Sequence, residues 1–276
     1  SNVAGINSEA SLFLFVPAIL NRENRIGLRR NKQKDTGMYR KETLTVENSP
    51  MEILVFEPEG PGPHPGIVCA QHLPIAHEGL EKDPFTIDTG EAFANSGYVC
   101  VIPFVFHWWT PETDIAVKRD EFRDDRAVAD LDAAFDLLAG METVDENRIG
   151  IIGHCWGGRL SWLHACHNAQ YKGLITLYGG RIKIGMGEGA TPPIELAGNI
   201  ACPVMGIFGN DDTNPSPEDV TDLDAALTAA NVPHEFHQYD GAGHGFQDFV
   251  NPERYKEEQA KDAWSKINVF LKSLLG

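Results

Sequence analysis

Residues 148–158, with the sequence RIGIIGHCWGG, decide the fold of this chain. The first five residues form a short apolar run, which is typical of a strand buried on both faces of a parallel sheet. The next six contain a glycine-x-cysteine-x-glycine pattern, in which the two glycines allow the strand to turn sharply into a helix. A strand that leads directly into a helix is the unit from which α/β sheets are built.

The rest of the chain continues this alternation of strand and helix. Strand-like segments lie at residues 42–46, 51–56, 66–69, 98–102, 173–178, 204–208 and 234–239. Helical spacing of three and four residues occurs at Val128, Leu131, Phe135 and Leu138, and again at Trp264, Ile267, Leu271 and Leu274. The first of these helices should end near Gly140, and Ser216 followed by Pro217 predicts the start of another. The order predicts an α/β fold with a mostly parallel central sheet and helices on both faces.

The composition is that of an ordinary globular enzyme-sized protein. The chain has 276 residues, of which 42% are hydrophobic and 23% charged, so one αβ domain over residues 41–276 fits the length. The formal net charge of −17 argues against a nucleic-acid partner and against an anionic membrane surface, because both need a basic footprint. We therefore expect a small-molecule partner.

Residues 1–40 are interpreted as an N-terminal arm that covers the body of the protein or packs on a partner subunit in a homo-oligomer. The apolar run 11–20 is too short to span a bilayer, and its positive charges follow it, unlike those of a secretory signal. The five cysteines are an odd number, are widely spaced and form no CxxC motif, which indicates a reducing compartment. A cytoplasmic location is the resulting expectation.

Cys155 is the candidate nucleophile, because it occupies the centre of the turn where such an elbow usually carries serine. The turn should expose the side chain to the cleft and direct the Trp156 backbone N–H toward the same point, as half of an oxyanion hole. The positive end of the following helix would stabilise a thiolate. The alternative is a buried structural thiol on a glycine-rich turn.

An acid and a base should follow the nucleophile along the chain. Asp211 and Asp212 come just after the strand at 204–208, and His244 lies among small residues after the last strand. His164 and His167 are one helical turn apart, but no third ligand cluster accompanies them, so we expect no metal and no cofactor.

With these residues placed, the chain resembles the dienelactone hydrolase (carboxymethylenebutenolidase-like) family of α/β-hydrolases from about residue 41 onward. The resemblance rests on GHCWGG at 153–158, FGNDD at 208–212 and GAGHGF at 241–246. It implies an α/β-hydrolase fold with Cys155 as nucleophile, His244 as base and Asp212, in preference to Asp211, as acid. It also implies that Leu73 supplies the second oxyanion N–H.

Two residues depart from the family pattern at the substrate site. His72 occupies the position of a glutamate that helps to activate the cysteine, and Asp248 occupies that of an arginine that holds the substrate carboxylate. The reversed charge at Asp248 would repel an anionic substrate. Candidate replacements for the arginine are Arg119, Arg123, Arg126, Arg159 and Arg181. Trp108 and Trp109 follow a strand and are candidates for an apolar wall of the pocket.

These features predict a cysteine-dependent hydrolase that cleaves an ester or lactone through an acyl-thioester intermediate. A broader carboxylesterase or thioesterase for neutral aromatic substrates is the alternative that Asp248, Trp108 and Trp109 favour. A non-catalytic α/β-hydrolase-fold protein that binds a ligand is the alternative outside enzymes, and the change at His72 keeps it open. A redox-sensing cysteine is a third interpretation, although no resolving cysteine lies next to Cys155.

Overall fold

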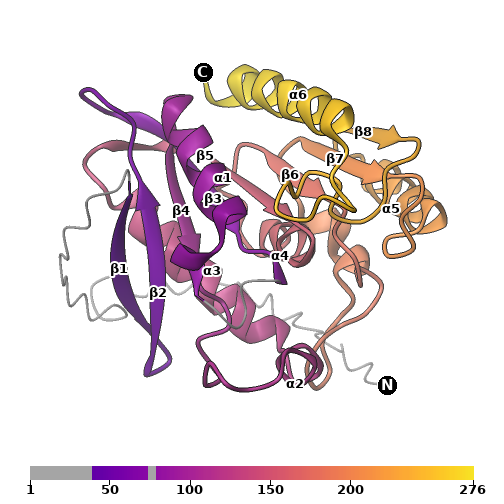
Figure 1. The fold of residues 1–276 in the computed structure, drawn as a ribbon, viewed down its shortest axis with the longest axis horizontal. Coiled ribbons are helices and arrows are strands. Elements are labelled where there is room, and N and C mark those ends of the chain that lie inside the picture. The colour runs from indigo at the N-terminus through magenta and orange to yellow at the C-terminus, as the bar shows by residue number, and fades with distance from the viewer. Residues whose placement is uncertain (1–38, 74–78) are drawn as a thin grey trace, which may run out of the picture.

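The computed structural model describes residues 39–73 and 79–276, and these form one eight-stranded sheet with helices on both faces (Figure 1). The order across the sheet is β1-β2-β4-β3-β5-β6-β7-β8. The strands are β1 (Tyr39–Val46), β2 (Ser49–Phe56), β3 (His64–Ala70), β4 (Val99–Pro103), β5 (Val144–His154), β6 (Leu174–Leu177), β7 (Val204–Gly209) and β8 (His234–Tyr239). All the predicted strands are present, and the predicted fold class is confirmed.

The first two strands run antiparallel to their neighbours. β1 pairs with β2 over its whole length, and β2 pairs with β4, so this hairpin forms one edge of the sheet. β3 to β8 are parallel, with Ile67 opposite Gly150 and Ile151 opposite Leu174. Their carboxyl ends therefore lie at one edge, where ligands bind in open α/β sheets.

The helices divide between the two faces. The helices are α1 (Pro84–Asn95), α2 (Ile115–Asp120), α3 (Asp124–Ala139), α4 (Trp156–Ala165), α5 (Pro217–Ala229) and α6 (Glu257–Leu275), with short 3₁₀ segments η3 (Leu80–Lys82) and η4 (Pro193–Asn199). Side chains of α3, α4 and α5 share one apolar core with one face of the strands, and side chains of α1 and α6 share a second core with the other face (Figure 1). Because neighbouring residues along a strand point to opposite faces, Ile67 joins the second core and Val68 the first.

The helix boundaries follow the signals in the sequence. α3 ends at Ala139 with Gly140 as its C-cap. α5 starts after Ser216, whose hydroxyl accepts the Asp219 N–H while the Asp219 carboxylate accepts the Ser216 N–H, which completes a capping box. These predicted ends are confirmed.

The glycines of the 153–158 turn are required by close backbone contacts. A Cβ on Gly157 would collide with the Ala70 carbonyl oxygen, and one on Gly158 would collide with the Leu177 carbonyl oxygen. β3 and β6, which carry those two carbonyls, are the strands on either side of β5. The glycines thus let α4 start directly above the sheet and bring Cys155 to its carboxyl edge.

The predicted N-terminal arm lies almost entirely outside the described residues, since β1 begins at Tyr39. Its packing on the body or on a partner subunit stays a prediction. Within residues 39–73 and 79–276, no helix is both long and apolar enough to cross a membrane.

Candidate active site

Cys155 lies at the junction of β5 and α4 in a backbone conformation that residues with a side chain rarely adopt, with φ 56° and ψ −119°. Its N–H donates to the Leu177 carbonyl at 3.0 Å, and its own carbonyl accepts the Gly158 N–H at 2.9 Å. The surrounding turn therefore holds the unusual conformation from both sides. The side chain stays half-exposed, while the other four cysteines are buried.

His244 joins the thiol to a carboxylate. Its Nε2 lies 3.0 Å from the Cys155 Sγ, and its Nδ1 lies 2.9 Å from the Asp212 Oδ2. The three residues follow the carboxyl ends of β5, β7 and β8, so the parallel sheet alone brings them together. The arrangement is that of a nucleophile, a base and an acid that orients the base.

The structure distinguishes the two adjacent aspartates. Asp212 is only 5% exposed, and its carboxylate accepts the His244 N–H at one oxygen and the Asn214 backbone N–H at the other, 2.8 Å away. The Asp211 side chain is exposed, and its backbone N–H donates to the Ala242 carbonyl. Only Asp212 is therefore placed to orient the imidazole.

The environment of His244 favours its protonated form. Burial by itself lowers its pKa, but the hydrogen bonds to Asp212 and Cys155, together with the negative charge on both groups, raise the pKa to about 10. The protonated ring donates from Nδ1 to the carboxylate and from Nε2 to the sulfur. Such a ring stabilises negative charge on the sulfur that it faces.

A cavity of about 120 Å³ opens beside the sulfur. Eight of the described residues line it: Leu73, Arg119, Cys155, Trp156, Gly180, Arg181, Asn214 and His244. Leu73 and Trp156, the two predicted oxyanion donors, thus border the same cavity as Cys155. Trp156 is the first residue of α4, and the N–H groups of a first helical turn have no partner within their helix.

His72 is turned toward a carboxylate and not into this cavity. Its Nε2 lies 2.6 Å from the Asp83 Oδ2, and its ring lies against Phe85 with 5.2 Å between centroids. Asp83 is also the N-cap of α1, where it accepts the Thr86 N–H at 2.9 Å. The burial of Asp83 raises its pKa, but the hydrogen bonds from His72 and Thr86 bring the pKa below its usual value. The ring thus ties the segment that carries Leu73 to α1.

The other predicted substrate-binding side chains have protein partners outside the cavity lining. The Trp108 indole donates to Asp130 and the Trp109 indole to Glu121, each at 3.0 Å. The Asp248 carboxylate accepts the backbone N–H of Val250. None of the three is among the described residues that border the 120 Å³ cavity, so their role in substrate binding stays a prediction.

The five candidate arginines have different environments. Arg119, on α2, and Arg181, after β6, border the cavity. Arg123 forms an exposed ion pair with Asp125, and the Arg126 guanidinium lies 4.7 Å from the centre of the Trp108 ring. Arg159 is completely buried against Asp124.

Sequence reasoning missed Asn214, which links two parts of the site. Its backbone N–H binds Asp212, and its side-chain oxygen accepts the Arg181 backbone N–H at 3.0 Å. The usable signal was its position two residues after the acid, where an Asp carboxylate commonly accepts a backbone N–H. Tyr178 was also missed; its buried ring lies edge-on to His244 at 5.4 Å.

Metal-ligating groups of three or more His, Cys, Asp or Glu are absent from the part of the chain that the structure describes. The two histidines that the sequence places one helical turn apart, His164 on α4 and His167 just after it, have other partners. His164 is hydrogen-bonded to Tyr171 and Asp132, and the His167 Nδ1 binds the Leu163 carbonyl.

Comparison with known proteins identifies the family. The sequence profile of the dienelactone hydrolase family matches residues 51–275. A Salmonella typhimurium protein provisionally assigned as a carboxymethylenebutenolidase is 30% identical over 213 residues, which cover 75% of this chain and 76% of the relative. A carboxymethylenebutenolidase of Rhodococcus opacus is 29% identical over 205 residues, which cover 70% of this chain and 77% of the relative.

Solved structures similar to this chain agree with the sequence comparison. The crystal structure of a Klebsiella pneumoniae protein provisionally assigned as a dienelactone hydrolase superposes with a TM-score of 0.74 at 28% identity, covering 84% of this chain and 97% of that one. A dienelactone hydrolase-like promiscuous phosphotriesterase from metagenomic libraries superposes with a TM-score of 0.71 at 18% identity, over 87% and 100% of the two chains, and shows the shared fold. The protein is a hydrolase that acts on ester bonds, and the chain belongs to the dienelactone hydrolase family.

Proposed function

We propose that the protein is a cysteine-dependent hydrolase that cleaves an ester or lactone through an acyl-thioester intermediate. The observation that carries this proposal is the contact of 3.0 Å between the Cys155 Sγ and the His244 Nε2, with Asp212 on the opposite ring nitrogen. A thiol held against a charged imidazole at the start of a helix is set up for nucleophilic attack. A ligand-binding protein without catalysis has no need of this alignment.

In the first half of the reaction the Cys155 thiolate attacks the carbonyl carbon, and a C–S bond forms. The carbonyl oxygen becomes an oxyanion, which the backbone N–H groups of Trp156 and Leu73 stabilise. As the oxyanion collapses, the C–O bond to the alcohol breaks, and the His244 imidazolium gives its Nε2 proton to the departing oxygen. The products are an acyl-thioester on Cys155 and a neutral His244.

In the second half, the neutral His244 removes a proton from a water molecule that attacks the thioester. The C–S bond breaks, the carboxylic acid leaves and the thiolate is restored beside an imidazolium. Asp212 keeps the Nδ1 proton in place throughout, so that Nε2 is the nitrogen that exchanges protons. For a lactone, the alcohol and the acid are two ends of one product.

We further propose that the substrate carries an acidic group near the scissile bond. Two arginines, Arg119 and Arg181, border the small cavity beside the thiol, and Asp248 is not among the described residues that border it. In a chain with a net charge of −17, two arginines at one cavity form a local site for an anion. The neutral aromatic alternative loses support, because Trp108 and Trp109 lie outside the cavity lining.

The test is a panel of p-nitrophenyl acetate, mono-p-nitrophenyl succinate and a lactone, given to the wild type and to Arg181→Gln. We expect the wild type to hydrolyse members of the panel. The loss of a charge-assisted hydrogen bond of about 1.5–3 kcal/mol should lower the acidic-to-neutral ratio of kcat/KM in Arg181→Gln by about 10- to 150-fold.

Arg123→Gln is the matched control, because it removes the same charge from an exposed ion pair outside the catalytic cavity. It should leave the ratio within about twofold of wild type. A folded wild type that hydrolyses no ester, thioester or lactone would contradict the hydrolase proposal. An unchanged ratio in Arg181→Gln would contradict only the proposal that the substrate carries an acidic group.

A further inference from the structure

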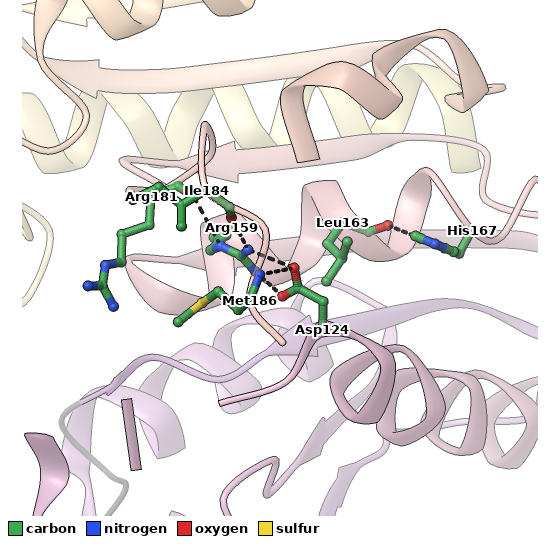
Figure 2. Close-up of polar contacts among 7 residues, drawn as sticks. All are labelled: Asp124, Arg159, Leu163, His167, Arg181, Ile184 and Met186. Carbon is green, nitrogen blue, oxygen red and sulfur yellow. Dashed lines mark hydrogen bonds and ion pairs between the residues drawn. The ribbon is translucent and has the colours of Figure 1, made fainter. Parts of the chain in front are cut away.

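Arg159 and Asp124 form a buried ion pair close to the catalytic cysteine. Arg159 is 0% exposed and lies on α4, one helical turn after Cys155, while Asp124 is 5% exposed and starts α3. The contact is bidentate: Nη1 lies 2.6 Å from Oδ1 and Nη2 lies 3.0 Å from Oδ2 (Figure 2). A planar guanidinium fits a carboxylate in this way with high geometric specificity.

The remaining polar atoms of the pair bind a single loop, residues 181–186. Arg159 donates from Nε to the Arg181 carbonyl at 3.3 Å and from Nη2 to the Ile184 carbonyl at 2.7 Å (Figure 2). The Asp124 carboxylate accepts the Met186 N–H at 2.9 Å, and the Asp124 N–H donates to the Met186 carbonyl at 2.8 Å. The loop is therefore attached to the ion pair at its start, its middle and its end.

Arg181, the first residue of this loop, is one of the two arginines that border the catalytic cavity. Its backbone has φ 55°, in the left-handed region that residues with a side chain seldom occupy. Its N–H is bound by the Asn214 side chain and its carbonyl by Arg159, so both sides of the residue are held. In Figure 2 the Arg181 side chain points away from the ion pair, and no interaction is drawn to its guanidinium.

We infer that the Asp124–Arg159 ion pair is a positioning unit that holds the 181–186 loop and thereby presents Arg181 to the acidic group of the substrate. This inference rests on the proposed function, because it assigns a role to Arg181 in substrate binding. The reason is geometric, because an uncommon backbone conformation persists only where the surrounding structure stabilises it. The ion pair supplies one of the two hydrogen bonds that fix the Arg181 backbone, and Asn214 supplies the other. Asp124 and Arg159 themselves do not touch the substrate.

The test variant replaces both partners at once, Asp124→Leu with Arg159→Met. Removing one partner alone would leave a buried charge unpaired and risk misfolding, whereas replacing both with apolar side chains of similar volume is commonly tolerated. The matched control is Asp125→Asn with Arg123→Gln, which removes the neighbouring exposed pair of the same charges. Thermal melts of all variants establish that each is folded.

The first readout is hydrogen–deuterium exchange of the Arg181 amide, which does not depend on any substrate. This amide is bound by Asn214 and not by the ion pair, so a faster rate reports release of the loop. We expect exchange to be at least about tenfold faster in the double replacement than in wild type or the control. An unchanged rate would overturn the inference, whatever the substrate of the enzyme is.

The second readout is the acidic-to-neutral ratio of kcat/KM, measured for Arg181→Gln, for the double replacement and for the three changes combined. If the ion pair acts through Arg181, the ratio should fall at least about tenfold in the double replacement, and adding the double replacement to Arg181→Gln should lower the ratio by less than about twofold more. If the effects of Arg181→Gln and of the double replacement on the ratio multiply in the combined variant, the inference is contradicted. A ratio that Arg181→Gln alone leaves unchanged would contradict the proposed acidic substrate, and the exchange rate would still decide the role of the ion pair.

Discussion

Replacing Cys155 with alanine should lower kcat for ester hydrolysis by about 10⁴- to 10⁶-fold, on the order of the losses found when single members of a catalytic triad are removed. Among the described residues, the others that line the cavity carry no hydroxyl or thiol, so the reaction would depend on water attack assisted by the oxyanion donors alone. The measurement is the initial rate with p-nitrophenyl acetate, or with whichever ester of the panel the wild type prefers. Retention of wild-type turnover would show that Cys155 is not the nucleophile.

Cys166→Ala is the matched control for this change. Cys166 is a free thiol at the C-terminal end of the same helix, and its burial raises its pKa to about 12, so it stays protonated and inert. We expect turnover close to wild type in this variant. Equal loss in both variants would point to damage to α4 and not to chemistry.

Replacing Asp212 with asparagine should lower kcat/KM by about 10⁴-fold, as the equivalent change does in a serine protease triad. An amide can present its N–H₂ group to the Nδ1 of His244, which favours the tautomer with the proton on Nε2 and leaves no base there. Asp211→Asn is the control, because the exposed Asp211 side chain does not contact His244. A larger loss in Asp211→Asn than in Asp212→Asn would reverse the assignment of the acid.

The same pair of variants has an expected pH dependence. Burial alone lowers the pKa of His244, and Asp212 and Cys155 bring it up to about 10. Loss of the Asp212 charge should therefore move the pKa of His244 downward, which the pH titration of its ring resonances by NMR can follow. A pKa unchanged by Asp212→Asn would contradict the role of this carboxylate.

The raised pKa of His244 should also make the free energy of unfolding depend on pH, with a definite sign. Since the pKa of His244 is raised in the folded protein from an ordinary value of 6.5, its protonation stabilises the fold fully below pH 6.5. This contribution is lost as the pH rises from 6.5 toward 10. In Asp212→Asn the decline in the free energy of unfolding over this range should be smaller, whereas Asp211→Asn should retain it.

The parts of the structure that depend on local sequence were predictable. The apolar runs, the helical spacing and the Ser216 cap determine elements through interactions within a few residues, and each of these elements is present. The Cys155 turn was predictable for the same reason, because its glycines are needed by the local backbone. The relative placement of Cys155, Asp212 and His244 then follows from the parallel sheet, since each comes after the carboxyl end of a strand.

Which of the candidate substrate-binding side chains line the cavity was not predictable, because side-chain direction depends on partners distant in the chain. Trp108 and Trp109 follow the end of β4, as a pocket wall would, but their indole N–H groups turn to Asp130 and Glu121. Five arginines were equivalent in the sequence, yet one is buried against Asp124 and two border the cavity. The hydrogen bond between His72 and Asp83 likewise joins two residues that are 11 positions apart in the chain.

The central claim is that Cys155 carries the acyl group during turnover. The most direct measurement is to mix the wild type with a p-nitrophenyl ester, quench in acid within milliseconds and map the digested protein by mass spectrometry. We predict an acyl adduct on the peptide that contains Cys155, absent from Cys155→Ala and lost when the quenched protein is treated with hydroxylamine, which cleaves thioesters. Turnover without an adduct on Cys155, or with an adduct on a different residue that persists in Cys155→Ala, would contradict the account.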